Sequence, residues 1–352
     1  RLPPRATITF KDAEFEDSEK FTYRLTGGRG AVLVNGGVGA VEPSPDQRGG
    51  HHIAANVTAV VEDTRAKIVA SLSGVGRPSA GAPSAMPPGT ISITAEGVPL
   101  TPQLVAALPD AKAREVIRPL RPRGRVDMRR QADRADASGA RIETQTDVRL
   151  AGCGVNYEGF PYDLAGVTGW IRARGKTWRF EELESRASDG RLLVAGHGGV
   201  QPTSRGSRLR LTLRGQGVPL EERLRVALPS DAQAARQYLL PRGRRNFDAR
   251  VTHDTGDEKP RVQISMTPDE RSVAIEPAFS TAGYRYRLEQ LDGRFDWRDN
   301  RLDMTDARAV HGRTAYGCDG VWETDPSGAW RLARERLRAD RLAFNHDFLL
   351  AA

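Results

Sequence analysis

The sequence contains a module of about 120 residues that recurs along the chain. The segment EGVPLTPQLVAALP, which contains Val98, returns as QGVPLEERLRVALP, which contains Val218. A third and more divergent copy, RADRLAFNHDFLLAA, places Leu342 at the same position. Tandem repetition predicts modules that stack and bury their apolar surfaces against their neighbours. We therefore divide the chain into module 1 (residues 1–128), module 2 (129–250) and module 3 (251–352).

Two features modify this repeat. Module 1 carries the stretch GRPSAGAPSAMPPG between residues 76 and 89, which has too few apolar residues to fold and is expected to be a flexible insertion. The sequence starts at Arg1 and stops at Ala352, inside the third copy. We therefore expect module 3 to be truncated and the chain to be a segment of a longer protein.

Each module begins with amphipathic strands. In residues 141–150 apolar residues and threonines alternate with charged and polar residues, with a period of two that is typical of a strand with one buried face. Gly-containing or polar turns separate further segments of this kind. They are expected near residues 160–173, 177–186, 190–198 and 207–215.

A short helical hairpin is expected after the strands. Thr101 can cap a helix that has Pro102 at its first position, where the missing N–H costs nothing. In the second copy, Ser230 and Gln233 have the spacing of a capping box for a second helix, which Pro241 ends. The predicted fold is mainly β, with tandem modules of antiparallel amphipathic strands in an elongated, groove-like sheet, each module closed by a helical hairpin.

The net charge of +8 raises the question of nucleic-acid binding, because clustered Lys and Arg displace phosphate counterions. In RLRLTLRG, however, Arg208, Arg210 and Arg214 alternate with leucines, which is typical of the solvated face of a strand. We therefore expect no nucleic-acid partner, while attraction to anionic lipid headgroups remains open.

No motif in the chain predicts catalysis. The glycine-rich segment TGGRGAVLVNGG lacks the Lys of a phosphate-binding loop. His197 aligns with Cys318 in the next copy, so the repeat does not keep a ligand there. The two cysteines cannot form a four-ligand zinc site. We expect no enzyme activity, no metal and no cofactor.

The aromatic residues recur at fixed module positions, because Tyr23, Tyr162 and Tyr286 align. Two interpretations remain open. The tyrosines are core anchors where successive modules stack, or they are exposed platforms for a carbohydrate.

An amphipathic strand must cover its apolar face with a second sheet, with helices or with a ligand. The predicted helices are too short and too few to cover about five strands per module. A long trough with an apolar floor would remain, which suits acyl chains. The alternating positions predict these residues for the floor: Ile142, Val148, Leu150, Leu209, Leu211, Leu213, Val262, Ile264 and Met266.

The pattern resembles a known family. F-x-Y-x-L strands, G-x-L-x-V-x-G strands and the closing VPL…L…ALP segment are similar to the modules of AsmA-like bacterial envelope proteins of the TamB and YhdP group, which are distant relatives of bridge-like lipid-transfer proteins. The resemblance implies a periplasmic protein, anchored in the inner membrane through a segment outside this chain. Its β-groove would carry phospholipid toward the outer membrane, and other envelope proteins are conceivable partners.

Two other functions are alternatives to lipid transport. The chain would be a structural or adhesive scaffold of the cell envelope if its strands pair as closed β-sandwiches. A glycan-processing enzyme would require converging carboxylates, which the alignment of the copies does not reveal.

Overall fold

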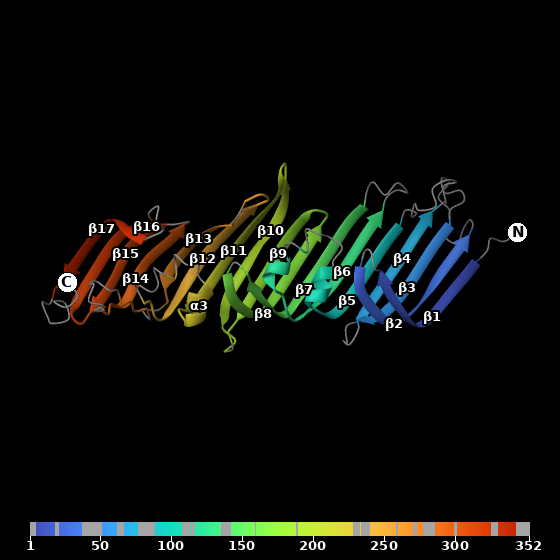
Figure 1. Cartoon of the computed structure of the whole chain (residues 1–352), viewed down its shortest axis with the longest axis horizontal. Helices are drawn as coiled ribbons and strands as arrows, with labels where there is room; N and C mark the ends of the chain where they lie inside the picture. The colour runs from blue at the N-terminus through green and yellow to red at the C-terminus, as the bar shows by residue number, and fades with distance from the viewer. Residues whose placement is uncertain are drawn as a thin grey trace. The chain divides into compact units, whose positions relative to one another are not determined.

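The computed structural model is mainly β, with an open antiparallel sheet and few helices (Figure 1). The mainly β prediction is therefore confirmed. The structure describes residues 5–17, 21–36, 51–61, 67–76, 89–107, 114, 117–134, 142–158, 160–187, 189–227, 233, 240–257, 260–269, 273–276, 286–298, 301–324 and 330–342.

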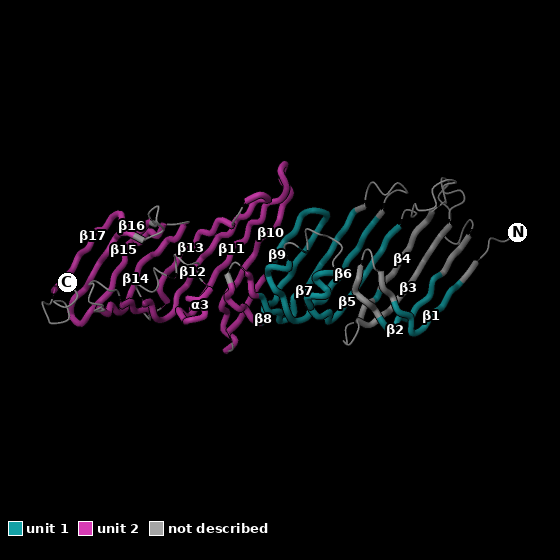
Figure 2. The backbone as a smooth tube through the Cα atoms, viewed as in Figure 1, with its two compact units in different colours: residues 1–155, 166–181 teal, residues 156–165, 182–352 magenta. Residues whose placement is uncertain are grey.

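The chain forms two compact units, which Figure 2 distinguishes by colour. Unit 1 comprises residues 1–155 and 166–181, and unit 2 comprises residues 156–165 and 182–352. Three strands contribute residues to both units: β8 (Phe160–Arg174), β9 (Thr177–Arg186) and, with its last two residues, β7 (Ile142–Tyr157).

Unit 1 is built on an antiparallel meander, in which each strand pairs with the next along the chain. Helix α1 (Pro102–Ala107) and the 3-10 helix η1 (Arg118–Leu120) lie between its fifth and sixth strands, and α1 contacts β2. The strands are β1 (Arg5–Asp17), β2 (Phe21–Gly36), β3 (His51–Val61), β4 (Lys67–Gly76), β5 (Gly89–Pro99), β6 (Arg125–Arg134) and β7 (Ile142–Tyr157).

Unit 2 contains a second antiparallel meander of the same kind. Helix α3 (Glu222–Ala227) follows its second strand. The strands are β10 (Leu192–Thr203), β11 (Gly206–Pro219), β12 (Arg244–Asp254), β13 (Arg261–Pro268), β14 (Glu289–Arg298), β15 (Arg301–His311), β16 (Thr314–Thr324) and β17 (Trp330–Asp340).

The predicted strands of module 2 are all present, but β7 continues to Tyr157 instead of ending near residue 150. The period-two pattern breaks at Gly152, which has a φ of +76°. Beyond this irregularity the strand resumes with the buried Cys153, whose thiol donates a hydrogen bond to the Arg125 carbonyl oxygen at 3.2 Å. Gly152, in the left-handed conformation, interrupts the sequence alternation, so the alternation alone does not predict that the strand continues to Tyr157.

The sequence repeat is also a repeat of backbone geometry. The pairing of β5 with β6 is irregular between Ala95 and Val98, and the pairing of β11 with β12 is irregular between Gly215 and Val218. After each irregular pairing, one hydrogen bond recurs at 2.9 Å: Leu100 N–H to the Gly124 carbonyl, and Leu220 N–H to the Gly243 carbonyl. Corresponding residues of the two copies therefore occupy equivalent structural positions.

The first helix of the predicted hairpin is present in both copies as α1 and α3. The Thr101 hydroxyl accepts a hydrogen bond from the Leu104 N–H at 3.1 Å, so the predicted N-cap is confirmed. Most of the second helix of each hairpin, including Ser230, lies outside the described residues. The complete hairpin therefore stays a prediction.

The insertion of module 1 connects two strands that pair directly, because Gly74 of β4 faces Gly89 of β5. Replacing residues 77–88 by the dipeptide Asn-Gly leaves a four-residue connection between these partners, a length that suits a hairpin. We expect the free energy of unfolding to change by no more than about 1 kcal/mol, because loop closure depends weakly on length. Urea denaturation measures this, and loss of a cooperative transition would contradict it.

Candidate functional site

The sheet of unit 2 has an apolar face on which side chains align across many strands. Paired residues of adjacent antiparallel strands point to the same side of a sheet. The register places one row across β10 to β16, which we call the central row. It consists of Gly196, Leu213, Ala249, Ile264, Trp297, Leu302 and Trp322. The large side chains of the central row are half-buried rather than sealed in a core.

Two shorter rows continue this face toward one end of the strands. Leu211 faces Gly198 on β10 and Val251 on β12, and Val251 in turn faces Val262 on β13. One step further, Leu209 faces Val200 and His253. The structure therefore brings five of the predicted floor residues onto one face, all of them half-buried: Leu209, Leu211, Leu213, Val262 and Ile264.

Toward the other end of the strands, the same face of unit 2 is covered. Met266 pairs with Phe247 and Phe295 and packs against a core that includes Val273, Leu291 and Phe295. Val273 is fully buried, and its carbonyl oxygen accepts a hydrogen bond from the Leu291 N–H. A segment between β13 and β14 thus helps to cover this end. Met266 is also half-buried, but it lies at the closed end of the face, away from the other five floor residues of unit 2.

In unit 1 the strand register also aligns apolar residues. The aligned residues across β1 to β6 are Ile8, Val32, Ala55, Leu72, Ile91 and Ala132. Ile8 and Ile91 are 59% and 38% exposed, respectively, so protein atoms do not cover this row at these positions.

The predicted floor residues of β7 lie on this face of unit 1. Val148 faces Met128, and Leu150 faces the buried Val126. Both are half-buried. Ile142 begins β7 opposite Arg134, but its side chain lies outside the described part of the structure.

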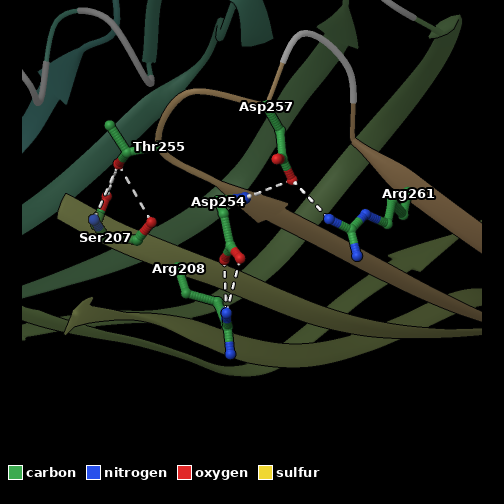
Figure 3. Close-up of polar contacts among 6 residues, drawn as sticks. All are labelled: Ser207, Arg208, Asp254, Thr255, Asp257 and Arg261. Atoms are coloured by element: carbon green, nitrogen blue, oxygen red, sulfur yellow. Dashed lines mark hydrogen bonds and ion pairs between the residues drawn. The ribbon is translucent and has the colours of Figure 1, made fainter. Parts of the chain in front are cut away.

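The opposite face of unit 2 is charged. Arg208 on β11 makes a two-pronged ion pair with Asp254 on β12, with its Nε 2.5 Å from Oδ1 and its Nη2 2.7 Å from Oδ2 (Figure 3). Hydrogen bonds from the Arg208 guanidinium hold the pKa of the Asp254 carboxyl below its usual range. Beside this pair, the Ser207 N–H donates to the Thr255 hydroxyl at 2.9 Å. These contacts fix the register of β11 on β12 at the start of β11 and the end of β12.

Further ion pairs continue along the charged face. Arg214 contacts Asp248 at 2.8 Å, Arg294 contacts Asp296 at 2.8 Å, and Arg301 contacts Asp303 at 2.7 Å. Arg210 and Arg214 are exposed, and Arg208 is half-buried in its ion pair. The arginines of RLRLTLRG therefore lie on the polar face, as the alternation predicts. The same strands form both faces, so each strand is amphipathic, with charged side chains on one face and apolar side chains on the other.

The aligned tyrosines contribute to packing where the structure describes their side chains. Tyr286 is 4% exposed, and its hydroxyl lies 2.9 Å from that of Tyr316. Tyr162 is half-buried, and burial raises the pKa of its phenol, with a further contribution from the nearby Glu221 carboxylate. These two positions fit core anchors better than exposed carbohydrate platforms. The side chain of Tyr23 lies outside the described residues.

Sequence reasoning missed Arg245, which lies on the apolar side of β12. Its guanidinium carbon is 4.5 Å from the centre of the Phe295 ring, and the residue is only 8% exposed. Desolvation by burial lowers the pKa of Arg245 to about 10, so it is still charged at neutral pH. The Nη1 atom is buried without a hydrogen-bond partner. The repeat carried a signal, because Val126 holds the equivalent position in module 1.

Comparisons of the chain with protein-family models, curated proteins and solved structures found no match. None of the helices in the described part of the chain is long and apolar enough to span a bilayer. Among the described residues, no cluster of three His, Cys, Asp or Glu side chains has the arrangement of a metal site. The apolar face is therefore the strongest candidate for a functional site.

Proposed function

We propose that the apolar faces of the two units bind the acyl chains of phospholipids, as the floor of a groove. One observation carries this proposal. The registers of unit 2 align half-buried apolar side chains across β10 to β16, while the ion pairs of the same strands lie on the other face. Half-buried apolar rows gain free energy when a ligand removes them from water, at about 25 cal/mol per Å².

The dimensions of the central row fit an acyl chain. Neighbouring strands are about 4.8 Å apart, so a row across seven strands is about 29 Å long. The hydrocarbon of one bilayer leaflet is about 15 Å thick. One row therefore has room for an acyl chain that runs across the strands, and the shorter rows beside it have room for a second chain.

The wider role follows from the resemblance of the modules to AsmA-like envelope proteins. In this proposal the protein is not an enzyme and needs no cofactor. It conducts phospholipid between membranes of a cell envelope, with its modules in the periplasm and an inner-membrane anchor outside the chain described. The ion-paired face would meet water and envelope protein partners.

Native mass spectrometry tests whether the protein binds lipid. We expect the chain, purified from cells with mild detergent and then freed of it, to carry mass increments of phospholipid that organic extraction removes. The measurement also identifies the bound lipid by its mass. A protein that stays at its polypeptide mass, also after incubation with phospholipid vesicles, would contradict the proposal.

A structural or adhesive envelope scaffold is the second candidate, and the closed core of unit 2 favours it. Val273, Leu291, Phe295 and their neighbours seal one end of the apolar face with protein side chains. A scaffold predicts that the half-buried rows are covered by another protein surface instead of lipid. The purified chain would then associate with itself or with envelope proteins and would carry no lipid.

A further inference from the structure

The further inference concerns the buried Arg245 and rests on the acyl-chain binding proposed above. Arg245, Phe247, Ala249, Val251 and His253 alternate along β12, and no irregularity interrupts their pairing with β13. They therefore share the apolar face. A guanidinium at one end of an apolar strip has the layout of a site for an amphiphile with one charged end.

The charge of Arg245 is unbalanced within the described structure. Its pKa is lowered by desolvation alone, and no described carboxylate contributes to the shift. The Phe295 ring stacks on the guanidinium, which offsets part of the cost but accepts no in-plane hydrogen bond. Buried charges in proteins are normally paired and hydrogen-bonded. Among the described residues, Arg245 therefore has no anion to balance its buried charge.

The fold does not require an arginine at this position. Arg245 faces Val218 just after the irregular pairing of β11, and Val126 faces Val98 just after the irregular pairing of β5. Val126 is buried to a similar extent, at 6% exposed. A valine thus fills the equivalent position in unit 1, and the arginine of unit 2 is a feature beyond what packing needs.

We propose that Arg245 anchors an unsubstituted oxyanion at the end of an acyl chain, such as a fatty-acid carboxylate or the terminal phosphate of a lysophosphatidic acid. The planar guanidinium binds either group through two parallel hydrogen bonds. From Arg245 the acyl chain would pass Phe247 and enter the central row at Ala249, where it runs across the strands. The head group would accept a hydrogen bond from Nη1 of Arg245 and displace the side chains that now cover this atom.

The test compares wild type with Arg245→Val, which installs the residue of module 1, and with Arg250→Val, the same change at an exposed position on the charged face of β12. Delipidated proteins are titrated with palmitate, with 1-palmitoyl lysophosphatidate, with the uncharged hexadecanol and with inorganic phosphate. We expect Arg245→Val to weaken binding of the anionic amphiphiles at least about tenfold and that of hexadecanol less than about twofold. Arg250→Val should change none of them.

The outcomes separate this inference from the proposed function. If wild type binds hexadecanol and the anionic amphiphiles but Arg245→Val binds all of them as well as wild type does, the anchor is wrong and acyl-chain binding stands. An equal loss for hexadecanol and palmitate would assign Arg245 a structural role and overturn the anchor. If wild type binds no amphiphile, both proposals fail.

Three further results complete the test. Tighter binding of palmitate or of lysophosphatidate identifies the preferred oxyanion. If inorganic phosphate binds as tightly as lysophosphatidate, the site binds free phosphate, and the proposal that Arg245 anchors an amphiphile is wrong. Arg245→Val should melt no lower than wild type, because it removes an unpaired buried charge. A lower melting temperature would support a structural role instead.

Discussion

Leu211→Glu is expected to weaken acyl-chain binding by unit 2 at least about tenfold, equivalent to about 1.4 kcal/mol or more, whereas Thr212→Glu is expected to leave it unchanged. Both variants add one negative charge to β11, at adjacent positions that face opposite sides of the sheet. Leu211 lies in an apolar row with Val251 and Val262, where a carboxylate would lose its hydration beneath a bound chain. Thr212 faces Arg250 on the charged side, where a carboxylate is favourable.

The measurement is fluorescence titration of the delipidated proteins with a labelled fatty acid or phospholipid. Because Leu211 is half-buried, the new side chain can reach water in the unliganded state, and we expect the fold to persist. Circular dichroism and the melting temperature check this directly. Equal binding by the two variants, or a loss confined to Thr212→Glu, would contradict the assignment of the faces.

Gly293→Ala is expected to destabilise unit 2 by about 3 kcal/mol or more. Gly293 lies in β14 with a φ of +116°, in the left-handed region that disfavours residues with a side chain. A Cβ atom there would be 2.7 Å from the Ala307 Cα and 2.8 Å from the Asp306 carbonyl oxygen. Both are backbone atoms of the paired strand β15, next to the core that contains Phe295 and Ala307, so rotation of a side chain cannot relieve the clash.

Gly312→Ala is the matched control. Gly312 also has a positive φ, of +59°, but a Cβ atom there would meet nothing within 4 Å. We expect this variant to cost about 1 kcal/mol, the strain of the left-handed conformation alone. Thermal unfolding monitored by tryptophan fluorescence measures the stability of both glycine variants, because Trp297 and Trp322 lie in the central row of unit 2. Similar melting temperatures for the two variants would contradict the packing described for β14 and β15.

Much of the fold was predictable from local pattern. The period-two alternation placed Leu209, Leu211 and Leu213 opposite Arg208 and Arg210, because side chains of a strand alternate strictly between its two faces. The Thr101 cap was readable for a similar reason, since it depends on residues three positions apart. Features that depend only on near neighbours in sequence are visible in the sequence itself.

Features that depend on distant segments were not predictable in this way. Met266 has the same alternation as Ile264, yet it packs against a core that contains Val273, which lies between β13 and β14, and Leu291 of β14. The burial of Arg245 depends on an irregular strand pairing and on Phe295 two strands away. Comparison of Val126 with Arg245 was the available clue, because the repeat places a charged residue where the other copy has an apolar one.

We propose that the apolar rows of unit 2 face lipid. Site-specific photo-crosslinking in cells tests it most directly, with a photoreactive residue at Leu209, Leu211 or Leu213 and, as matched positions on the same strand, at Arg208, Arg210 or Arg214. We expect lipid adducts from the three leucine positions and none from the three arginine positions. Lipid adducts from the arginine positions with none from the leucines, or adducts from neither set, would contradict the proposal.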